Sequence, residues 1–237
     1  MVLTQQPRWK RTLLLTGLWL NLLGLGVPLV AAEAKHDYAR WEPEISAFER
    51  SDRTNPPVRG CILFIGSSTI RFWQSLPQDY PGRPVINRGF GGSELADSTH
   101  FAERIIFPYE PSMIFLRAGG NDLWAGKTPE QVFADFKDFV AKVRTRLPRT
   151  EIVFIGWNPS VARWKQVAKE KEMNRLVADY VRQTPGLNYV DTWSIPLDAA
   201  GKPRPELFRA DGLHFNAAGY RELIRRVRPF LPAPAVK

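Results

Sequence analysis

The sequence predicts an α/β fold with a doubly wound parallel sheet of about five strands, in a three-layer α/β/α, flavodoxin-like arrangement. Short apolar runs alternate along the chain with stretches of helical periodicity. The runs are continuous rather than alternating, which is typical of parallel strands buried on both faces. They cover residues 62–65, 85–86, 113–116, 152–155 and 187–190.

Helical periodicity is clearest after the third run, where apolar residues recur every three or four positions. These residues are Val132, Phe136, Phe139, Val140, Val143 and Leu147. A further amphipathic helix is expected to start at Asn216, with Tyr220, Leu223 and Val227 on one face. In such folds ligands bind beyond the carboxyl ends of the strands, so the residues directly after each run are the functional candidates.

Residues 1–34 have the order of a secretory signal peptide: a basic region, an apolar region and a small-residue cleavage site. We therefore expect an exported protein, periplasmic or secreted. An uncleaved membrane anchor is the alternative, because the apolar region approaches the roughly 20 residues that span a bilayer. An entry segment (35–60), one main domain (61–231) and a short tail (232–237) are expected to follow.

Composition narrows the classes of function. The formal net charge of +9 suits an anionic partner, but the basic residues are spread along the chain, so we expect no nucleic-acid binding and no obligate partner. Cys61 is the only cysteine, which excludes an intramolecular disulfide. With three histidines in all, a zinc cluster of histidine and thiolate ligands is hard to assemble. We expect no metal and no cofactor.

An acid–base pair lies near the C-terminus, where Asp211 and His214 are three positions apart in the turn before the last helix. A carboxylate that accepts from one ring nitrogen fixes the histidine tautomer. The other nitrogen is then free to take a proton from a hydroxyl nucleophile. This pair therefore requires a serine elsewhere in the chain.

Three strand ends offer partners for the pair. Ser67 and Ser68 follow the first run at a strand-to-helix turn, where a serine is either a nucleophile or a helix cap. A glycine-rich segment with Gly92 follows the second run and lacks the spacing of a dinucleotide or phosphate loop. Asn121 follows the third run and can direct its side-chain N–H at a developing oxyanion.

Taken together, four short blocks resemble the SGNH hydrolases, the GDSL-like esterase and lipase superfamily, over roughly residues 61–220. The resemblance makes Ser68 the nucleophile, His214 the general base and Asp211 the residue that orients it. It also implies an oxyanion hole formed by the Ser68 N–H, the Gly92 N–H and the Asn121 side chain. The matching blocks are residues 64–68, 87–92, 119–122 and 211–214.

One position departs from the family pattern, because Ser67 stands where the family usually has aspartate. We expect Ser67 to be a local hydrogen-bonding substitute. Three tryptophans, Trp73, Trp124 and Trp164, are candidates to line the substrate pocket, although tryptophan is often half-buried packing.

The resemblance implies hydrolysis of carboxylic esters through an acyl-enzyme. The substrates in view are short acyl esters, lysophospholipids and O-acetylated sugars. A catalytically silent carbohydrate or cell-wall binding module on the same fold is the alternative, motivated by Ser67 and by the basic charge.

Overall fold

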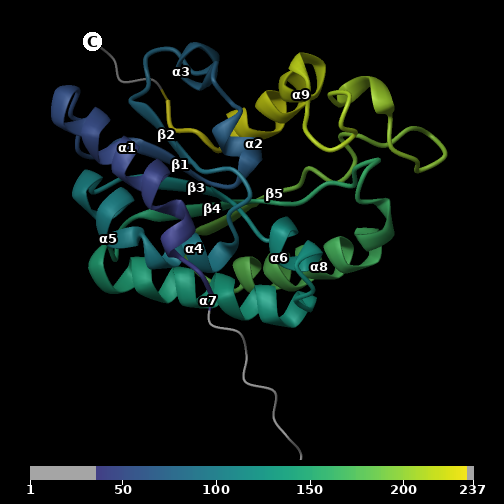
Figure 1. Cartoon of the computed structure of the whole chain (residues 1–237), viewed down its shortest axis with the longest axis horizontal. Coiled ribbons are helices and arrows are strands. Elements are labelled where there is room, and N and C mark those ends of the chain that lie inside the picture. The colour runs from purple at the N-terminus through teal and green to yellow at the C-terminus, as the bar shows by residue number, and fades with distance from the viewer. Residues whose placement is uncertain (1–35, 234–237) are drawn as a thin grey trace, which may run out of the picture. The chain divides into compact units, whose positions relative to one another are not determined.

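The computed structural model describes residues 36–233 and contains a five-stranded, all-parallel sheet in the order β2-β1-β3-β4-β5. This confirms the expected doubly wound α/β fold (Figure 1). The predicted signal peptide lies outside the described residues. The strands are β1 (Ile62–Gly66), β2 (Val85–Gly89), β3 (Met113–Arg117), β4 (Glu151–Ile155) and β5 (Leu187–Val190).

Helices cover both faces of the sheet (Figure 1). One layer packs on the face formed by Leu63, Ile65 and their neighbours. It consists of α1 (Glu42–Thr54), α4 (Leu95–His100), α5 (Ala102–Ile105), α7 (Pro129–Arg146) and α8 (Val167–Arg182). The opposite layer consists of α2 (Ser68–Arg71), α3 (Leu76–Asp79) and α9 (Ala217–Val227).

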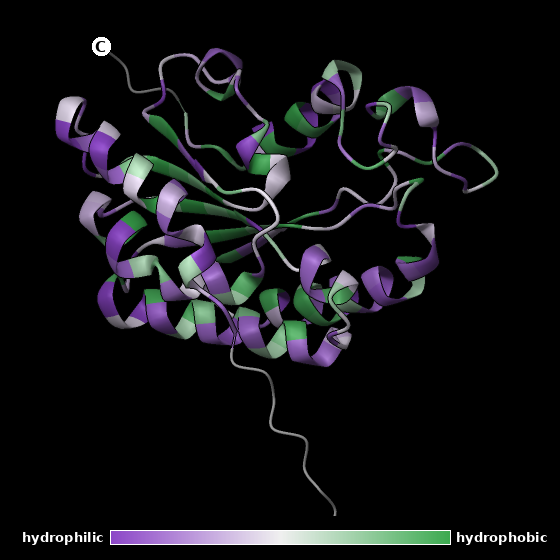
Figure 2. Cartoon of the chain, in the orientation of Figure 1, coloured by the Kyte–Doolittle hydropathy of each residue, from purple (hydrophilic) through white to green (hydrophobic). Residues whose placement is uncertain are grey.

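Successive side chains of a strand point to opposite sides of the sheet. Because the strands are continuous apolar runs, both faces of the sheet are apolar. Leu63 and Ile65 of β1 join one core cluster, while Ile62 and Phe64 join the other. All five residues of β1 and of β3 are buried. Figure 2 shows the consequence, with hydrophobic strands in the middle and hydrophilic residues on the outer sides of the helices.

The sheet differs from the prediction at β2, which continues for three residues past the apolar pair 85–86. Its polar residues are tolerated because β2 is an edge strand and each finds partners. The Asn87 amide donates to the carbonyl oxygen of Ile70 at 2.6 Å. Arg88 forms an ion pair with Asp52 of α1 and donates to the Tyr109 hydroxyl at 2.9 Å. The entry segment is thereby fastened to the sheet edge.

Several expected helices are present. The periodic segment forms α7, and its N-cap Thr128 forms a reciprocal capping box with Gln131. Asn216 caps α9 by accepting from the N–H groups of Ala218 and Gly219. Short 3-10 turns complete the chain: η1 (Ala39–Trp41), η2 (Phe107–Tyr109), η3 (Trp164–Gln166), η4 (Pro205–Leu207) and η5 (Arg228–Phe230).

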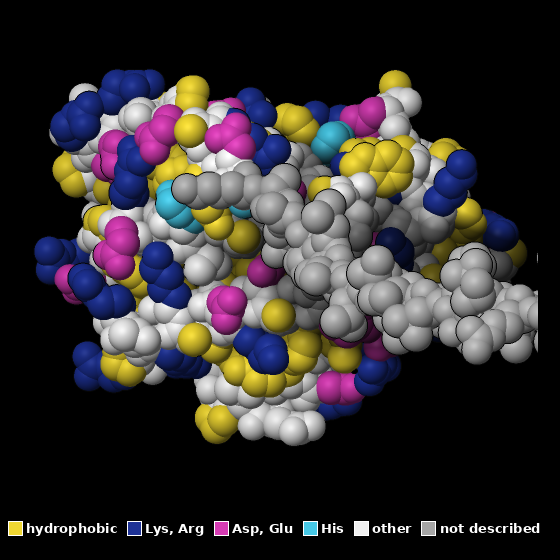
Figure 3. Space-filling model, turned by 60° about the horizontal axis from the view of Figure 1, so that its bottom comes forward, with side chains coloured by type: hydrophobic (Ala, Val, Ile, Leu, Met, Phe, Trp, Pro, Cys, Tyr) yellow, Lys and Arg dark blue, Asp and Glu magenta, His cyan; other side chains and the backbone are white. Residues whose placement is uncertain are grey.

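Surface charge is mixed on the face shown in Figure 3, where Lys and Arg side chains are interleaved with Asp and Glu. Of the helices within residues 36–233, none is long and apolar enough to cross a membrane.

Candidate active site

Ser68 lies at the carboxyl end of β1, as the first residue of α2. The turn that exposes it depends on Gly66, whose φ of +133° is a conformation that residues with a side chain rarely adopt. A Cβ at Gly66 would also lie 2.1 Å from the carbonyl oxygen of Arg117 on β3. Glycine therefore allows the chain to turn sharply at the sheet edge and to present Ser68 on the rim.

His214 links Ser68 to Asp211 through a chain of two hydrogen bonds. Its Nε2 lies 3.0 Å from the Oγ of Ser68, and its Nδ1 lies 2.7 Å from the Oδ2 of Asp211. The second oxygen of Asp211 accepts from the backbone N–H groups of Leu213 and His214, at 2.9 Å each. This geometry matches that of an acid–base–nucleophile triad.

Asp211 is held in its charged form. Desolvation opposes ionisation, but the hydrogen bonds from the His214 ring and from the N–H groups of His214 and Leu213 outweigh it, so the pKa of Asp211 falls to about 2. The carboxylate is therefore available to His214 throughout the neutral pH range.

The His214 ring is fixed by its surroundings. Phe72, which follows α2, packs against it edge to face with ring centroids 5.0 Å apart. The backbone N–H of Arg209 donates to the carbonyl oxygen of His214 at 2.7 Å, which closes the turn that carries Asp211. Both contacts hold the imidazole toward Ser68.

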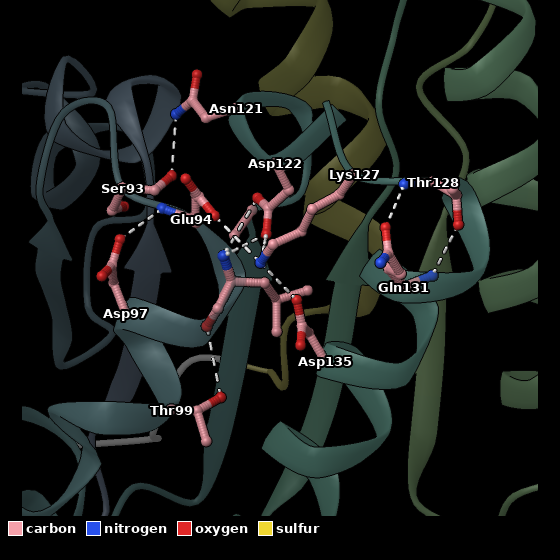
Figure 4. Close-up of polar contacts among 12 residues, drawn as sticks. Ser93, Glu94, Asp97, Thr99, Asn121, Asp122, Lys127, Thr128, Gln131 and Asp135 are labelled. Atoms are coloured by element: carbon pink, nitrogen blue, oxygen red, sulfur yellow. Dashed lines mark hydrogen bonds and ion pairs between the residues drawn. The ribbon is translucent and has the colours of Figure 1, made fainter. Parts of the chain in front are cut away.

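Two backbone N–H groups and one side chain are the candidate donors of an oxyanion hole. The N–H groups of Ser68 and Gly92 make no hydrogen bond with another described residue. The third donor, the Nδ2 of Asn121, gives one hydrogen to the carbonyl oxygen of Ser93 at 2.9 Å (Figure 4). Since an amide nitrogen carries two hydrogens, one of them stays available to a ligand.

Asn121 belongs to α6 (Gly120–Trp124), and the next residue anchors that helix. The Asp122 carboxylate points away from Asn121 and toward Lys127 (Figure 4). It also accepts from the N–H of Leu95, at 3.1 Å. Burial raises the pKa of Asp122 to about 6, with the charge of Lys127 opposing that shift. Asp122 thus connects α6 to the start of α4, directly after the glycine loop (residues 89–93).

The three predicted tryptophans are in different environments. Trp73 is only 1% exposed and donates to Asp79 at 2.7 Å, so it belongs to the core and does not line a pocket. Trp124 is 59% exposed, and the guanidinium of Arg163 lies 5.1 Å from its ring centroid. Trp164 is half-buried, with the Lys202 ammonium 5.0 Å from its ring. The expectation for Trp73 was wrong because this residue lies in the link between α2 and α3 and packs in the core against Phe64 of β1.

Ser67 also differs from expectation. Its hydroxyl is fully buried and has no hydrogen-bond partner among the described residues. Ser67 is therefore not the hydrogen-bonding substitute that we expected, although its backbone N–H donates to the carbonyl oxygen of Arg117 at 3.0 Å.

Three arginine contacts at this rim were not foreseen from the sequence. Arg163 donates to the Oδ1 of Asn121 at 2.9 Å. Arg71 and Arg209 both lie over the ring of Phe72. The available signals were sequence spacings: Arg71 follows Ser68 by three residues on the same helix, and Arg209 precedes Asp211 by two. Within the described residues, no cluster of His, Cys, Asp and Glu side chains is arranged to hold a metal ion.

The parallel sheet, the α/β/α layers and the serine–histidine–aspartate arrangement at the carboxyl ends of the strands define an α/β protein with the site of a hydrolase. The model of the GDSL-like lipase/acylhydrolase family matches residues 65–222, so the chain belongs to this family and is an esterase or acylhydrolase. Among curated protein sequences, none matches the chain closely enough to count as a relative.

Solved structures with the same fold share little sequence with this chain. A protein from Streptococcus pneumonia named for platelet activating factor is 21% identical, with a TM-score of 0.72 over 82% of this chain and 94% of that one. A GDSL-like lipase from Bacteroides thetaiotaomicron is 14% identical, with a TM-score of 0.62 over 82% and 96%.

An acetyl-xylooligosaccharide esterase from Geobacillus is 18% identical, with a TM-score of 0.60 over 76% of this chain and 99% of that one. Structures of an acetylxylan esterase from Geobacillus stearothermophilus include catalytic mutants in which a serine, an aspartate or a histidine is replaced by alanine.

Proposed function

We propose that the protein hydrolyses carboxylic esters through a covalent acyl-enzyme on Ser68. The observation that carries this proposal is the hydrogen-bonded chain from the Ser68 Oγ through His214 to Asp211. It is supported by the acetylxylan esterase, whose catalytic mutants replace the same three residue types. In that enzyme the replaced aspartate and histidine are also three residues apart.

In the first half-reaction His214 removes the proton of Ser68 as its Oγ attacks the ester carbonyl. The carbonyl oxygen becomes an oxyanion, which the N–H groups of Ser68 and Gly92 and the Asn121 amide stabilise. The carbon–oxygen bond to the alcohol then breaks, and the alcohol leaves with the proton held by His214. Asp211 stabilises the imidazolium that forms in between.

In the second half-reaction water takes the place of the alcohol. His214 removes a proton from the water as it attacks the acyl carbon, and the same donors stabilise the second oxyanion. Collapse of this intermediate releases the carboxylic acid and returns the proton to Ser68. None of these steps requires a cofactor.

The substrates that we propose are short acyl esters, lysophospholipids or O-acetylated sugars, because the named neighbours include lipases and an esterase of acetylated xylo-oligosaccharides. We further propose that the protein acts after export, on the evidence of the sequence of residues 1–34. The N-terminal sequence of the protein recovered from the host envelope tests this point: export with cleavage predicts a start close to residue 35.

Replacement of Ser68 tests the mechanism. Ser68→Ala should lower kcat for 4-nitrophenyl acetate on the order of 10³-fold or more, because the nucleophile is lost. Ser51→Ala on the exposed side of α1 is the matched control and should keep the wild-type rate. Near-normal hydrolysis by Ser68→Ala would refute the proposal, and the absence of any hydrolysis by the wild type would favour the binding module instead.

A panel of substrates then defines the acyl group. Esters of one alcohol with acyl chains from acetyl to decanoyl should be compared with acetylated xylo-oligosaccharides. A rate that falls steeply beyond acetyl supports a sugar deacetylase, whereas a preference for long chains contradicts it.

A further inference from the structure

Two arginine side chains flank the aromatic ring that packs on His214. The guanidinium of Arg209 lies 4.4 Å from the ring centroid of Phe72, and that of Arg71 lies 5.8 Å from it. The same ring touches His214, with centroids 5.0 Å apart. Both arginines are exposed, so an anion in solution can reach their charges.

Each arginine lies next to a segment that carries a residue of the proposed active site. Arg71 is on α2, and its Nη1 would lie 2.7 Å from a Cβ at Gly91, the neighbour of the candidate donor Gly92. Arg209 is part of the turn that carries His214, since their backbones are hydrogen-bonded at 2.7 Å. One guanidinium is therefore close to the glycine loop and the other to the base.

The two charges are not neutralised by the protein. Within residues 36–233 neither arginine forms an ion pair, whereas Arg104 and Arg175 each bind two carboxylates. Arg209 uses only its Nε, which donates to the carbonyl oxygen of Phe215 at 3.2 Å. Its terminal amino groups and the whole guanidinium of Arg71 make no hydrogen bond with a described residue.

The one carboxylate of the triad is already engaged. Both oxygens of Asp211 accept hydrogen bonds, from the His214 ring and from two backbone N–H groups. It is these contacts, and not an arginine, that lower its pKa. Asp211 is therefore not available to neutralise either arginine, and both guanidinium groups can attract an anion.

We propose that Arg71 and Arg209 bind an anionic group of the substrate, so that this site prefers esters that carry a carboxylate, phosphate or sulfate close to the scissile bond. Guanidinium groups remain charged at every relevant pH, and their planar array of N–H donors matches such oxyanions. This inference rests on the proposed hydrolysis at Ser68 and adds the chemical class of its substrate.

The experiment compares matched esters that differ only in one charge. Mono(4-nitrophenyl) succinate and its methyl ester place the charge on the acyl side. The acetate esters of 4-hydroxybenzoate and of its methyl ester place it on the alcohol side. For each pair, the ratio of kcat/KM for the anionic ester to that for the neutral ester measures the selectivity for charge, and the neutral ester reports any general damage.

The variants are Arg71→Gln and Arg209→Gln, with Arg221→Gln on the exposed side of α9 as a control that makes the same change in net charge. We expect the ratio for at least one pair to fall about 10-fold in each rim variant and to stay at the wild-type value in Arg221→Gln. The wild-type ratio should also fall as salt rises to about 0.5 M, because the contact is exposed and screened.

A ratio that is unchanged in both rim variants would overturn the inference, even if the absolute rates decline. Ser68→Ala distinguishes this result from a failure of the proposed mechanism. If hydrolysis depends on Ser68 but the ratio does not depend on the arginines, the mechanism stands and the anion site does not. The pair that responds identifies the side of the ester that carries the charge.

Discussion

Arg163 donates a hydrogen bond to the Oδ1 of Asn121 at 2.9 Å, while the Nδ2 of the same amide donates to the carbonyl oxygen of Ser93 at 2.9 Å. Guanidinium is only a donor and a carbonyl is only an acceptor, so both neighbours require the same orientation of the amide. The positive charge also withdraws electrons from the amide and strengthens its N–H groups as donors. Arg163 is thus a positioning residue for Asn121.

Replacing Arg163 should weaken oxyanion binding indirectly. Arg163→Ala is expected to lower kcat for a neutral acetate ester about 10-fold, with a smaller change in KM, because the contact acts on the transition state. Arg163→Lys should recover part of the loss. In an Asn121→Ala background the arginine change should have little further effect, since its target is gone. Additive losses in this double-mutant cycle would contradict the positioning role.

Asn121 itself should matter more. Asn121→Ala removes one of the three proposed oxyanion donors and is expected to lower kcat by about 10² to 10³. Asn55→Ala, at the exposed end of α1, is a matched control whose rate should not change. Steady-state kinetics of both variants on one ester give the comparison. A loss in kcat below about threefold in Asn121→Ala would contradict the assignment of this side chain to the oxyanion hole.

Asp211 should support both catalysis and acid stability. Asp211→Asn is expected to lower kcat on the order of 10² to 10⁴, because an amide no longer fixes the tautomer that accepts the Ser68 proton. The folded pKa of about 2 lies below the ordinary 3.8, so the carboxylate adds stability that is present above 3.8 and is lost as pH falls toward 2.

Melting temperatures measure the second effect. The Tm advantage of the wild type over Asp211→Asn should be constant between about pH 5 and 8 and should shrink below about pH 4. An advantage that grows as the solution becomes more acidic would contradict the sign of this shift.

The buried Glu170 should make the folding stability depend on pH with the opposite sign to Asp211. It is 1% exposed and accepts from Gln166 at 2.7 Å, and burial raises its pKa from 4.5 to about 7. Between these two values the unfolded chain loses the proton and the folded chain keeps it, so stability falls as pH rises. Above about pH 7 the loss is complete, on the order of 3 kcal/mol.

Glu170→Gln removes this titration and nearly preserves the shape of the side chain. The unfolding free energy of the variant minus that of the wild type should therefore increase as pH rises from about 5 to about 8. Denaturant unfolding at both pH values measures this difference. A difference in unfolding free energy that does not change between these two pH values would show that Glu170 titrates normally.

The parts of this protein that could be predicted from the sequence are those set by local spacing. Strands buried on both faces are continuous apolar runs, so β1, β3 and β4 could be predicted from the sequence. Asp211 and His214 are three residues apart, so their contact follows from one turn. The contact of His214 with Ser68 spans 146 residues and was expected only from the order of the four family blocks.

The remaining features depend on tertiary packing. The polar end of β2 is stabilised by Asp52 and Tyr109, which the sequence does not place beside it. Trp73 is buried because its ring packs against Phe64 of β1, a contact that the sequence does not indicate. The bond from Arg163 to Asn121 joins residues that are 42 positions apart, so spacing alone could not indicate it.

The central claim is that Ser68 is the nucleophile activated by His214. The most direct measurement is to label the wild-type protein with a fluorophosphonate, which phosphonylates activated serines, and to locate the label by peptide mass spectrometry. A single adduct on Ser68 that disappears in His214→Ala is the predicted result. An unlabelled wild-type protein, or an adduct on another residue, would contradict the account.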